Sequence, residues 1–169
     1  KLRTTFVGPV DLVGLDVGSY AVKAVMLSVD RQGCRLVNWA YAPLGLKAET
    51  APEERRLVAA RTIMDTLGPR GMDKRPVAVS VSGNSVIVRY VKLNKYTKQE
   101  LEPIIASEAE PYIPFDIREV HLAFHILRDL EEEGKKKMEV ALVAAKKQLL
   151  DEHLAIVTSA GLLPLVVDV

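Results

Sequence analysis

A short polar segment between two apolar runs carries the side chains of this chain that are most able to do chemistry. It reads Asp16-Val17-Gly18-Ser19-Tyr20-Ala21-Val22-Lys23. Gly18 can adopt a positive φ and lets backbone N–H groups approach an anion. Ser19 adds a hydroxyl, Lys23 adds a positive charge, and Asp16 could hold Mg²⁺ through water. The spacing predicts a phosphate-and-metal loop, although the same residue types are common in ordinary hairpin turns.

The composition is that of a globular protein with a substantial core, since 49% of its 169 residues are hydrophobic. Lysine and arginine (23) nearly balance aspartate and glutamate (22), for a net charge of +1. This balance gives no electrostatic reason to expect nucleic acid or an acidic membrane as a partner. One cysteine, Cys34, rules out an internal disulfide, and we expect it to be a buried small hydrophobe. No apolar run approaches the roughly 20 residues that span a bilayer.

The elements that position the loop are predicted to be strands. Alternating apolar residues indicate strands at 12–17, 21–29, 34–41 and 77–81. Between the third and fourth of these, residues 53–67 have a helical period, and Gly68-Pro69 ends the helix. The residues expected on its buried face are Leu57, Ala60, Met64 and Leu67.

The middle of the chain predicts a strand, a helix and two further strands. The first strand covers residues 86–93, and a capping box of Thr97 and Glu100 begins the helix, which Pro103 should distort. Two more strands are expected at 119–128 and 138–145, joined by a charged hairpin loop at 129–137.

The last segment returns to the pattern of the first. A helix is expected over residues 146–160, ended by Gly161, and a buried strand over 162–169. Because the chain stops within an apolar strand, we expect the rest of its fold to lie outside these 169 residues.

The three histidines do not indicate a metal site. His121 and His125 lie on one predicted strand, where a separation of four residues places them about 13 Å apart. A single ion does not bridge that distance. His153 lies in an amphipathic helix, where packing or exposure to solvent is expected.

Four strings, in order along nearly the whole chain, resemble the PilM family of type IV pilus assembly, bacterial actin-like proteins related to FtsA. They occupy residues 13–19, 81–93, 110–117 and 162–169. The first is generic to the actin-like ATPase superfamily. The third, which contains Tyr112-Ile113-Pro114-Phe115-Asp116-Ile117, is more specific.

The resemblance implies an α/β fold: a partial actin-like, ribonuclease H-like subdomain 1A with an inserted strand-helix-strand-strand subdomain 1C. Subdomain 1A would comprise residues 1–84 and 146–169, and subdomain 1C residues 85–145. The second half of the actin-like fold would be absent.

ATP and Mg²⁺ are therefore expected to bind in the intact protein only. Asp16, Gly18, Ser19, Tyr20 and Lys23 would form half of the nucleotide site, with Asp16 holding Mg²⁺ through water. No catalytic residue is expected within this chain. We expect no measurable ATPase activity from the 169 residues alone, and turnover that vanishes on Asp16→Ala would contradict this.

The resemblance also implies an adaptor at the cytoplasmic face of the bacterial inner membrane, working with other proteins of the pilus assembly platform. It would bind the N-terminal peptide of a PilN-like membrane protein in a groove between subdomains 1A and 1C. Arg89, Tyr90 and Phe115 are expected to border this groove, while the alternative is that Phe115 packs inside subdomain 1C. Two other functions remain open: an ATPase or phosphotransferase fragment of the actin fold, and an FtsA-like cell-division protein.

Overall fold

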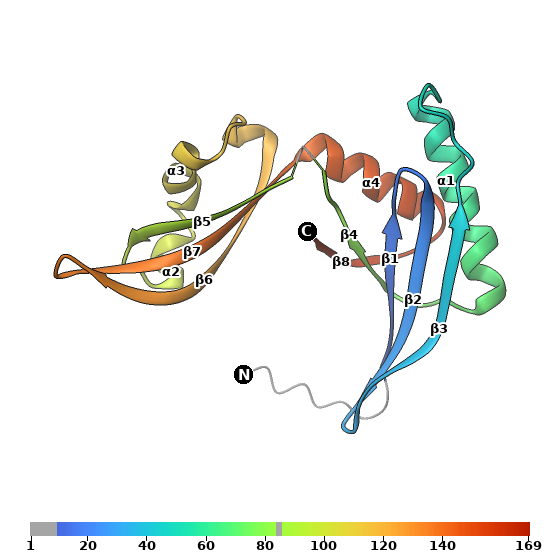
Figure 1. The fold of residues 1–169 in the computed structure, drawn as a ribbon, viewed down its shortest axis with the longest axis horizontal. Coiled ribbons are helices and arrows are strands. Elements are labelled where there is room, and N and C mark those ends of the chain that lie inside the picture. The colour runs from blue at the N-terminus through green and yellow to red at the C-terminus, as the bar shows by residue number, and fades with distance from the viewer. Residues whose placement is uncertain (1–9, 84–85) are drawn as a thin grey trace. The chain divides into compact units, whose positions relative to one another are not determined.

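The computed structural model describes residues 10–83 and 86–169, which divide into two compact units (Figure 1). Unit 1 contains residues up to Val81 together with Glu152–Asp168, and unit 2 contains Ser82–Asp151 and Val169. Each unit has its own sheet and its own hydrophobic core. Residues 86–145 therefore do not extend the sheet of the opening hairpin. The two units divide at 81/82 and 151/152, and the subdomain boundaries expected from the sequence were 84/85 and 145/146.

Unit 1 is built on a five-stranded sheet of order β3-β2-β1-β4-β8. Its strands are β1 (Val10–Val17), β2 (Ala21–Asp30), β3 (Gly33–Pro43), β4 (Val77–Ser80) and β8 (Pro164–Asp168). The first three are antiparallel, whereas β4 runs parallel to both β1 and β8. All five predicted strands are confirmed. The expected burial of the last is wrong: β8 is an edge strand, and Leu165 and Val166 are exposed.

Two helices, α1 (Pro52–Leu67) and α4 (Lys147–Ser159), contribute to the core that covers one face of this sheet. The predicted bounds of α1 are confirmed, including its end before Gly68, but the predicted buried face is partly wrong. The helix buries Ala59, Ala60, Ile63 and Leu67, whereas Leu57 is 66% exposed and Met64 is 53% exposed. The buried stripe therefore passes through Ala59 and Ile63 instead of Leu57 and Met64.

Unit 2 contains a three-stranded antiparallel sheet of order β5-β7-β6. Its strands are β5 (Val86–Asn94), β6 (Val120–Glu132) and β7 (Lys135–Lys146). Two short helices, α2 (Lys98–Leu101) and α3 (Ile105–Ala109), pack against one face of it. Short 3₁₀ turns follow at Glu110–Tyr112 and Ile117–Glu119. The fully buried centre of this core includes Leu101, Met138, Val140 and Leu142.

The start and the break of the helical segment both follow the sequence. Thr97 and Glu100 form the predicted capping box, in which each side chain accepts a hydrogen bond from the other residue's backbone N–H. Pro103 lies in a turn between α2 and α3, so the expected distortion divides the helix in two.

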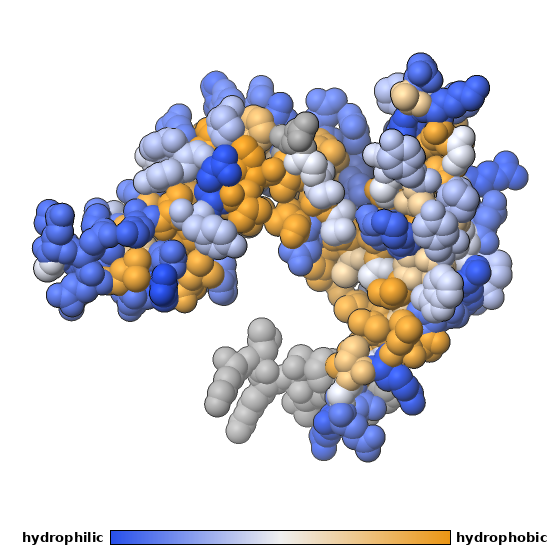
Figure 2. Space-filling model, in the orientation of Figure 1, coloured by the Kyte–Doolittle hydropathy of each residue, from blue (hydrophilic) through white to orange (hydrophobic). Residues whose placement is uncertain are grey.

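The charged segment 129–137 is wrongly predicted as a loop. The strands β6 and β7 continue to Glu132 and Lys135, leaving a two-residue turn of Glu133 (φ 52°) and Gly134 (φ 72°). Its opposite charges face one another across the strands, Glu131 with Lys136 and Glu132 with Lys135. Such cross-strand pairs favour strand pairing over a loop. Figure 2 shows hydrophilic side chains covering this end of the β6–β7 hairpin, at the left of the view.

Replacing Glu133 by asparagine should stabilise unit 2. Glu133 is the single described residue other than glycine with a positive φ, a conformation that asparagine tolerates and that a two-residue hairpin turn before glycine favours. We expect a gain of about 0.5–1 kcal/mol in the free energy of unfolding, measured by urea titration. Glu131→Asn, in the strand opposite Lys136, is the control, and an equal gain there would contradict the turn argument.

The structure contradicts the predicted burial of Cys34 and confirms that His121 and His125 lie on one strand. Cys34 is exposed at the beginning of the edge strand β3, so its predicted burial is wrong. His121 and His125 both lie on β6, on the same side of the strand and exposed.

Candidate phosphate loop and peptide-binding face

The predicted phosphate loop is a tight turn between β1 and β2. The Gly18 N–H donates to the Ala21 carbonyl at 3.0 Å. Gly18 does not have the positive φ that was expected of it. A Cβ at this position would lie 3.3 Å from the Ala21 oxygen, a tight contact that favours glycine in the turn. Ser19 and Tyr20 at the tip of the turn are exposed.

Asp16 and Lys23 face each other directly across β1 and β2. The Lys23 ammonium donates to the Asp16 carboxylate at 3.0 Å. This hydrogen bond, followed by the attraction of the carboxylate charge, raises the pKa of Lys23 above its ordinary value. The two charges therefore neutralise each other in the absence of a ligand.

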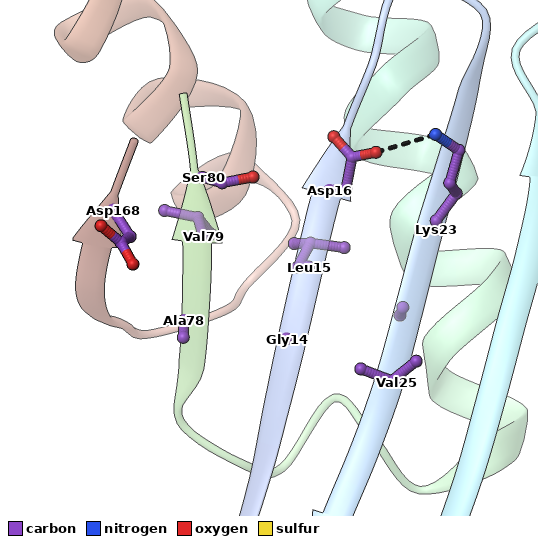
Figure 3. Close-up of a pocket in the computed structure, with 10 residues that line it drawn as sticks. Gly14, Leu15, Asp16, Lys23, Val25, Ala78, Val79, Ser80 and Asp168 are labelled. Atoms are coloured by element: carbon purple, nitrogen blue, oxygen red, sulfur yellow. Dashed lines mark hydrogen bonds and ion pairs between the residues drawn. The ribbon is translucent and has the colours of Figure 1, made fainter. Parts of the chain in front are cut away.

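A pocket of about 320 Å³ lies beside this ion pair, on the face of the unit 1 sheet opposite the core (Figure 3). Asp16 of β1, Ser80 of β4 and Asp168 of β8 line it at the ends of the strands. Gly14 and Ala78 leave space in its floor because their side chains are small. Ser80 and Asp168 were not predicted as site residues. The signal for them is the parallel order of β1, β4 and β8, since the carboxyl ends of parallel strands meet at one edge.

The side chains that line this pocket fit a magnesium ion whose remaining ligands are water and a phosphate. No group of three or more His, Cys, Asp or Glu side chains able to hold a metal occurs in residues 10–83 and 86–169. Mg²⁺ commonly binds through one or two carboxylates, completed by water and substrate phosphate. Asp16 and Asp168 supply that number. Lys23, which is bonded to Asp16, would have to share or release that carboxylate.

His153 of α4 is a polar group near the loop that sequence analysis assigned only to packing or solvent. Its Nε2 atom is enclosed, and no hydrogen-bond partner for it occurs in the described part of the chain. Burial lowers the pKa of His153, and the charge of Asp16 partly opposes this. Burial thus disfavours the charged form of the imidazole, which lies within electrostatic reach of the Asp16 carboxylate.

The three predicted partner residues divide between the two faces of the unit 2 sheet. Arg89 pairs with Leu142, which is buried in the core under the helices, so it lies on the helix-covered face. Tyr90 pairs with Ala141 and points to the opposite face, because successive side chains of a strand alternate. Phe115 packs against the core on the same side as Arg89. The structure thus brings Arg89 and Phe115 to one face and separates them from Tyr90.

Phe115 has a defined structural setting. It is half-buried, and the Lys146 ammonium lies 4.6 Å from its ring centroid, a cation–π contact. The next residue, Asp116, accepts hydrogen bonds from both the backbone and the guanidinium of Arg118. These contacts fix the chain as it enters β6.

The carboxyl of Asp116 should titrate well below other aspartates. The hydrogen bonds from the Arg118 side chain, and then from its backbone, lower the pKa of Asp116 to about 2. The stabilisation that this pair provides is present at neutral pH and disappears as the pH falls through 2. In Arg118→Ala the carboxyl pKa should rise but stay below 3.8, because the backbone donor remains. A ¹³C NMR titration measures both values, and an unchanged pKa in the variant would contradict the assignment.

The face of the unit 2 sheet opposite its helices is open within that unit. Two cross-strand rows form its centre: Val88, Val143 and Ala123, and next to them Tyr90, Ala141 and His125. Tyr90 is 70% exposed and Val88 is 41% exposed. We call these six residues the open face. It presents an apolar centre with a phenol and an imidazole at one end.

Comparison with known proteins identifies the family. The family profile of the type IV pilus assembly protein PilM matches residues 14–169. A solved PilM-PilN type IV pilus biogenesis complex superposes with a TM-score of 0.78 and 31% identity, over 95% of this chain and 47% of that chain. This chain thus spans about half the length of its solved relative.

A more distant structure shows the fold alone. The cytoplasmic domain of EpsL, an inner membrane component of the type II secretion system of Vibrio cholerae, matches with a TM-score of 0.59 and 17% identity. The match covers 94% of this chain and 56% of the EpsL chain. The shared architecture is a partial actin-like fold. With the family profile matching residues 14–169, the chain belongs to the PilM family of type IV pilus assembly proteins.

Proposed function

We propose that this chain acts as a non-enzymatic adaptor of type IV pilus assembly that binds the N-terminal cytoplasmic peptide of a PilN-like inner-membrane protein. The observation that carries the proposal is the open face of unit 2, an exposed and largely apolar surface on an antiparallel sheet. The solved relative, described as a PilM-PilN complex, supports the class of partner.

The chemistry of the open face suits a short apolar peptide. Val88, Val143 and Ala123 offer a shallow surface without charge, on which aliphatic side chains would be removed from water. Tyr90 adds a large ring with a polar hydroxyl, the kind of side chain that anchors many interfaces. The His125 imidazole can form hydrogen bonds with a peptide backbone.

The proposed place of action is the cytoplasmic side of the inner membrane, among other proteins of the assembly platform. In the described part of the chain, no helix is both long and apolar enough to cross a bilayer. On this proposal, the membrane partner supplies the attachment.

We further propose that the intact protein binds ATP and Mg²⁺, with Asp16, Gly18, Ser19, Tyr20 and Lys23 as half of the site. The pocket beside Asp16 and Lys23, with Asp168 at its edge, supports this assignment. When bound, Mg²⁺ would neutralise phosphate charge. Lys23 would leave Asp16 for a phosphate oxygen, and the Ser19 hydroxyl would be available to a phosphate at the tip of the turn.

The adaptor proposal is tested by titrating a synthetic PilN-type N-terminal peptide into the ¹⁵N-labelled chain. We expect NMR shift changes at open-face positions of β5, β6 and β7, and none with a scrambled peptide of the same composition. No binding, or shift changes confined to the helix-covered side of the sheet, would contradict the proposal.

A further inference from the structure

A second pocket, of about 300 Å³, lies at the other side of the turn between β1 and β2. Two positively charged side chains contribute to its lining. Its lining comes from three segments of unit 1: Ser19 and Tyr20 of the turn, Lys47 of the loop after β3, and Arg55 of the first turns of α1. None of these segments is a site by itself. Their convergence places a hydroxyl and two cations around one cavity.

Both cations lack a carboxylate partner within residues 10–83 and 86–169. Four other cations of unit 1 are paired, Lys23 with Asp16, Arg56 with Glu53, Arg61 with Asp65 and Arg75 with Asp11. No such ion pair holds Lys47 or Arg55. Glu49 and Glu54 lie on the same two segments, but neither lines the pocket. The pocket therefore has two cationic side chains in its lining and no carboxylate.

The loop that presents Lys47 is held in place. The Lys47 N–H donates to the Thr50 hydroxyl at 3.1 Å, and the Lys47 carbonyl accepts from the Arg55 guanidinium at 3.1 Å. The Leu44 N–H donates to the Tyr20 carbonyl at 2.8 Å, which ties the loop to the turn. Arg55 uses one of its five N–H donors in this way, so others remain for a ligand.

We infer that this pocket binds a phosphate-class oxyanion between the Lys47 ammonium, the Arg55 guanidinium and the Ser19 hydroxyl. Charge-assisted hydrogen bonds from two cations and a hydroxyl match the three acceptor oxygens of a phosphoryl group. The oxyanion could be the terminal phosphate of a nucleotide or free phosphate. The site shares Ser19 with the proposed nucleotide loop but is independent of the peptide-binding proposal, which concerns unit 2.

The test is an NMR titration of the ¹⁵N-labelled chain with inorganic phosphate, against chloride at matched ionic strength. We expect shift changes at Ser19, Tyr20, Lys47 and Arg55. Affinity should fall about threefold to tenfold in Lys47→Ala and in Arg55→Ala. Lys74→Ala removes an exposed lysine beyond the other end of α1 and should leave the affinity unchanged.

Two further arms identify the source of the phosphate. If ATP shifts these amides more strongly than phosphate does and AMP does not, the pocket takes the terminal phosphate of a nucleotide. If phosphate and ATP act equally, it takes the free oxyanion. Absence of shifts, or equal shifts in Lys47→Ala and the unchanged chain, overturns the inference, and neither result bears on peptide binding at Tyr90.

Discussion

Replacing Ile63 by alanine should remove about 3–4 kcal/mol from the free energy of unfolding of unit 1. The side chain has no exposed surface and lies in the core between α1 and the sheet. Truncation leaves a cavity that the rigid strands β1 and β2 cannot fill, so both burial and packing contacts are lost. Urea titration followed by circular dichroism measures the change, and hydrogen exchange at the amides of β1 and β2 locates it.

The matched control is Leu57→Ala on the same helix, six residues earlier. Leu57 is 66% exposed, so its truncation should change the stability by less than about 0.5 kcal/mol. This pair separates the observed buried face of α1 from the face predicted by periodicity. Equal losses for the two variants would place Leu57 in the core and contradict the helix orientation.

Tyr90→Ser should weaken binding of a PilN-type peptide tenfold or more, whereas Arg89→Ser should change it by less than about twofold. The two residues are adjacent on β5 but point to opposite faces of the sheet. Truncating an aromatic anchor at the centre of an interface commonly costs about 2 kcal/mol or more. Because Tyr90 is 70% exposed, its replacement should leave the fold intact.

Fluorescence anisotropy of a labelled peptide measures these affinities, and circular dichroism checks folding of each variant. Phe115→Ala completes the set: it should destabilise unit 2 through lost packing while the folded fraction keeps its affinity. A reversed pattern, with Arg89→Ser and Phe115→Ala weakening binding and Tyr90→Ser neutral, would move the docking surface to the helix-covered side.

The strands and helices could be predicted from the sequence because their periodicities are long and their ends are marked. Thr97 with Glu100, Pro103 and Gly161 each act through local backbone chemistry, and each acts as predicted. The face of α1 could not be predicted as well. Apolar residues lie on more than one side of that helix, and the sheet that it contacts selects the buried stripe.

In the candidate sites, too, residues of one continuous segment could be predicted together, whereas residues brought together by strand order or register could not. The hairpin carrying Asp16 and Lys23 was predictable because both residues belong to one continuous segment. Asp168 reaches the same pocket through strand order, which connects residues more than 140 positions apart. Likewise, Arg89 and Tyr90 are neighbours in sequence, but the register of β5 against β7 assigns them to opposite faces.

The outer edge of β3 has a consequence for handling this polypeptide in isolation. This strand is 11 residues long, ends one side of its sheet, and carries Leu36, Trp39 and Tyr41 with more than half of each side chain exposed. Arg35 is the single charged residue along it. A strand edge of this length with one charged residue is a template for adding strands from other molecules. Concentrated samples should therefore self-associate through this edge, and an added lysine there should keep them dispersed.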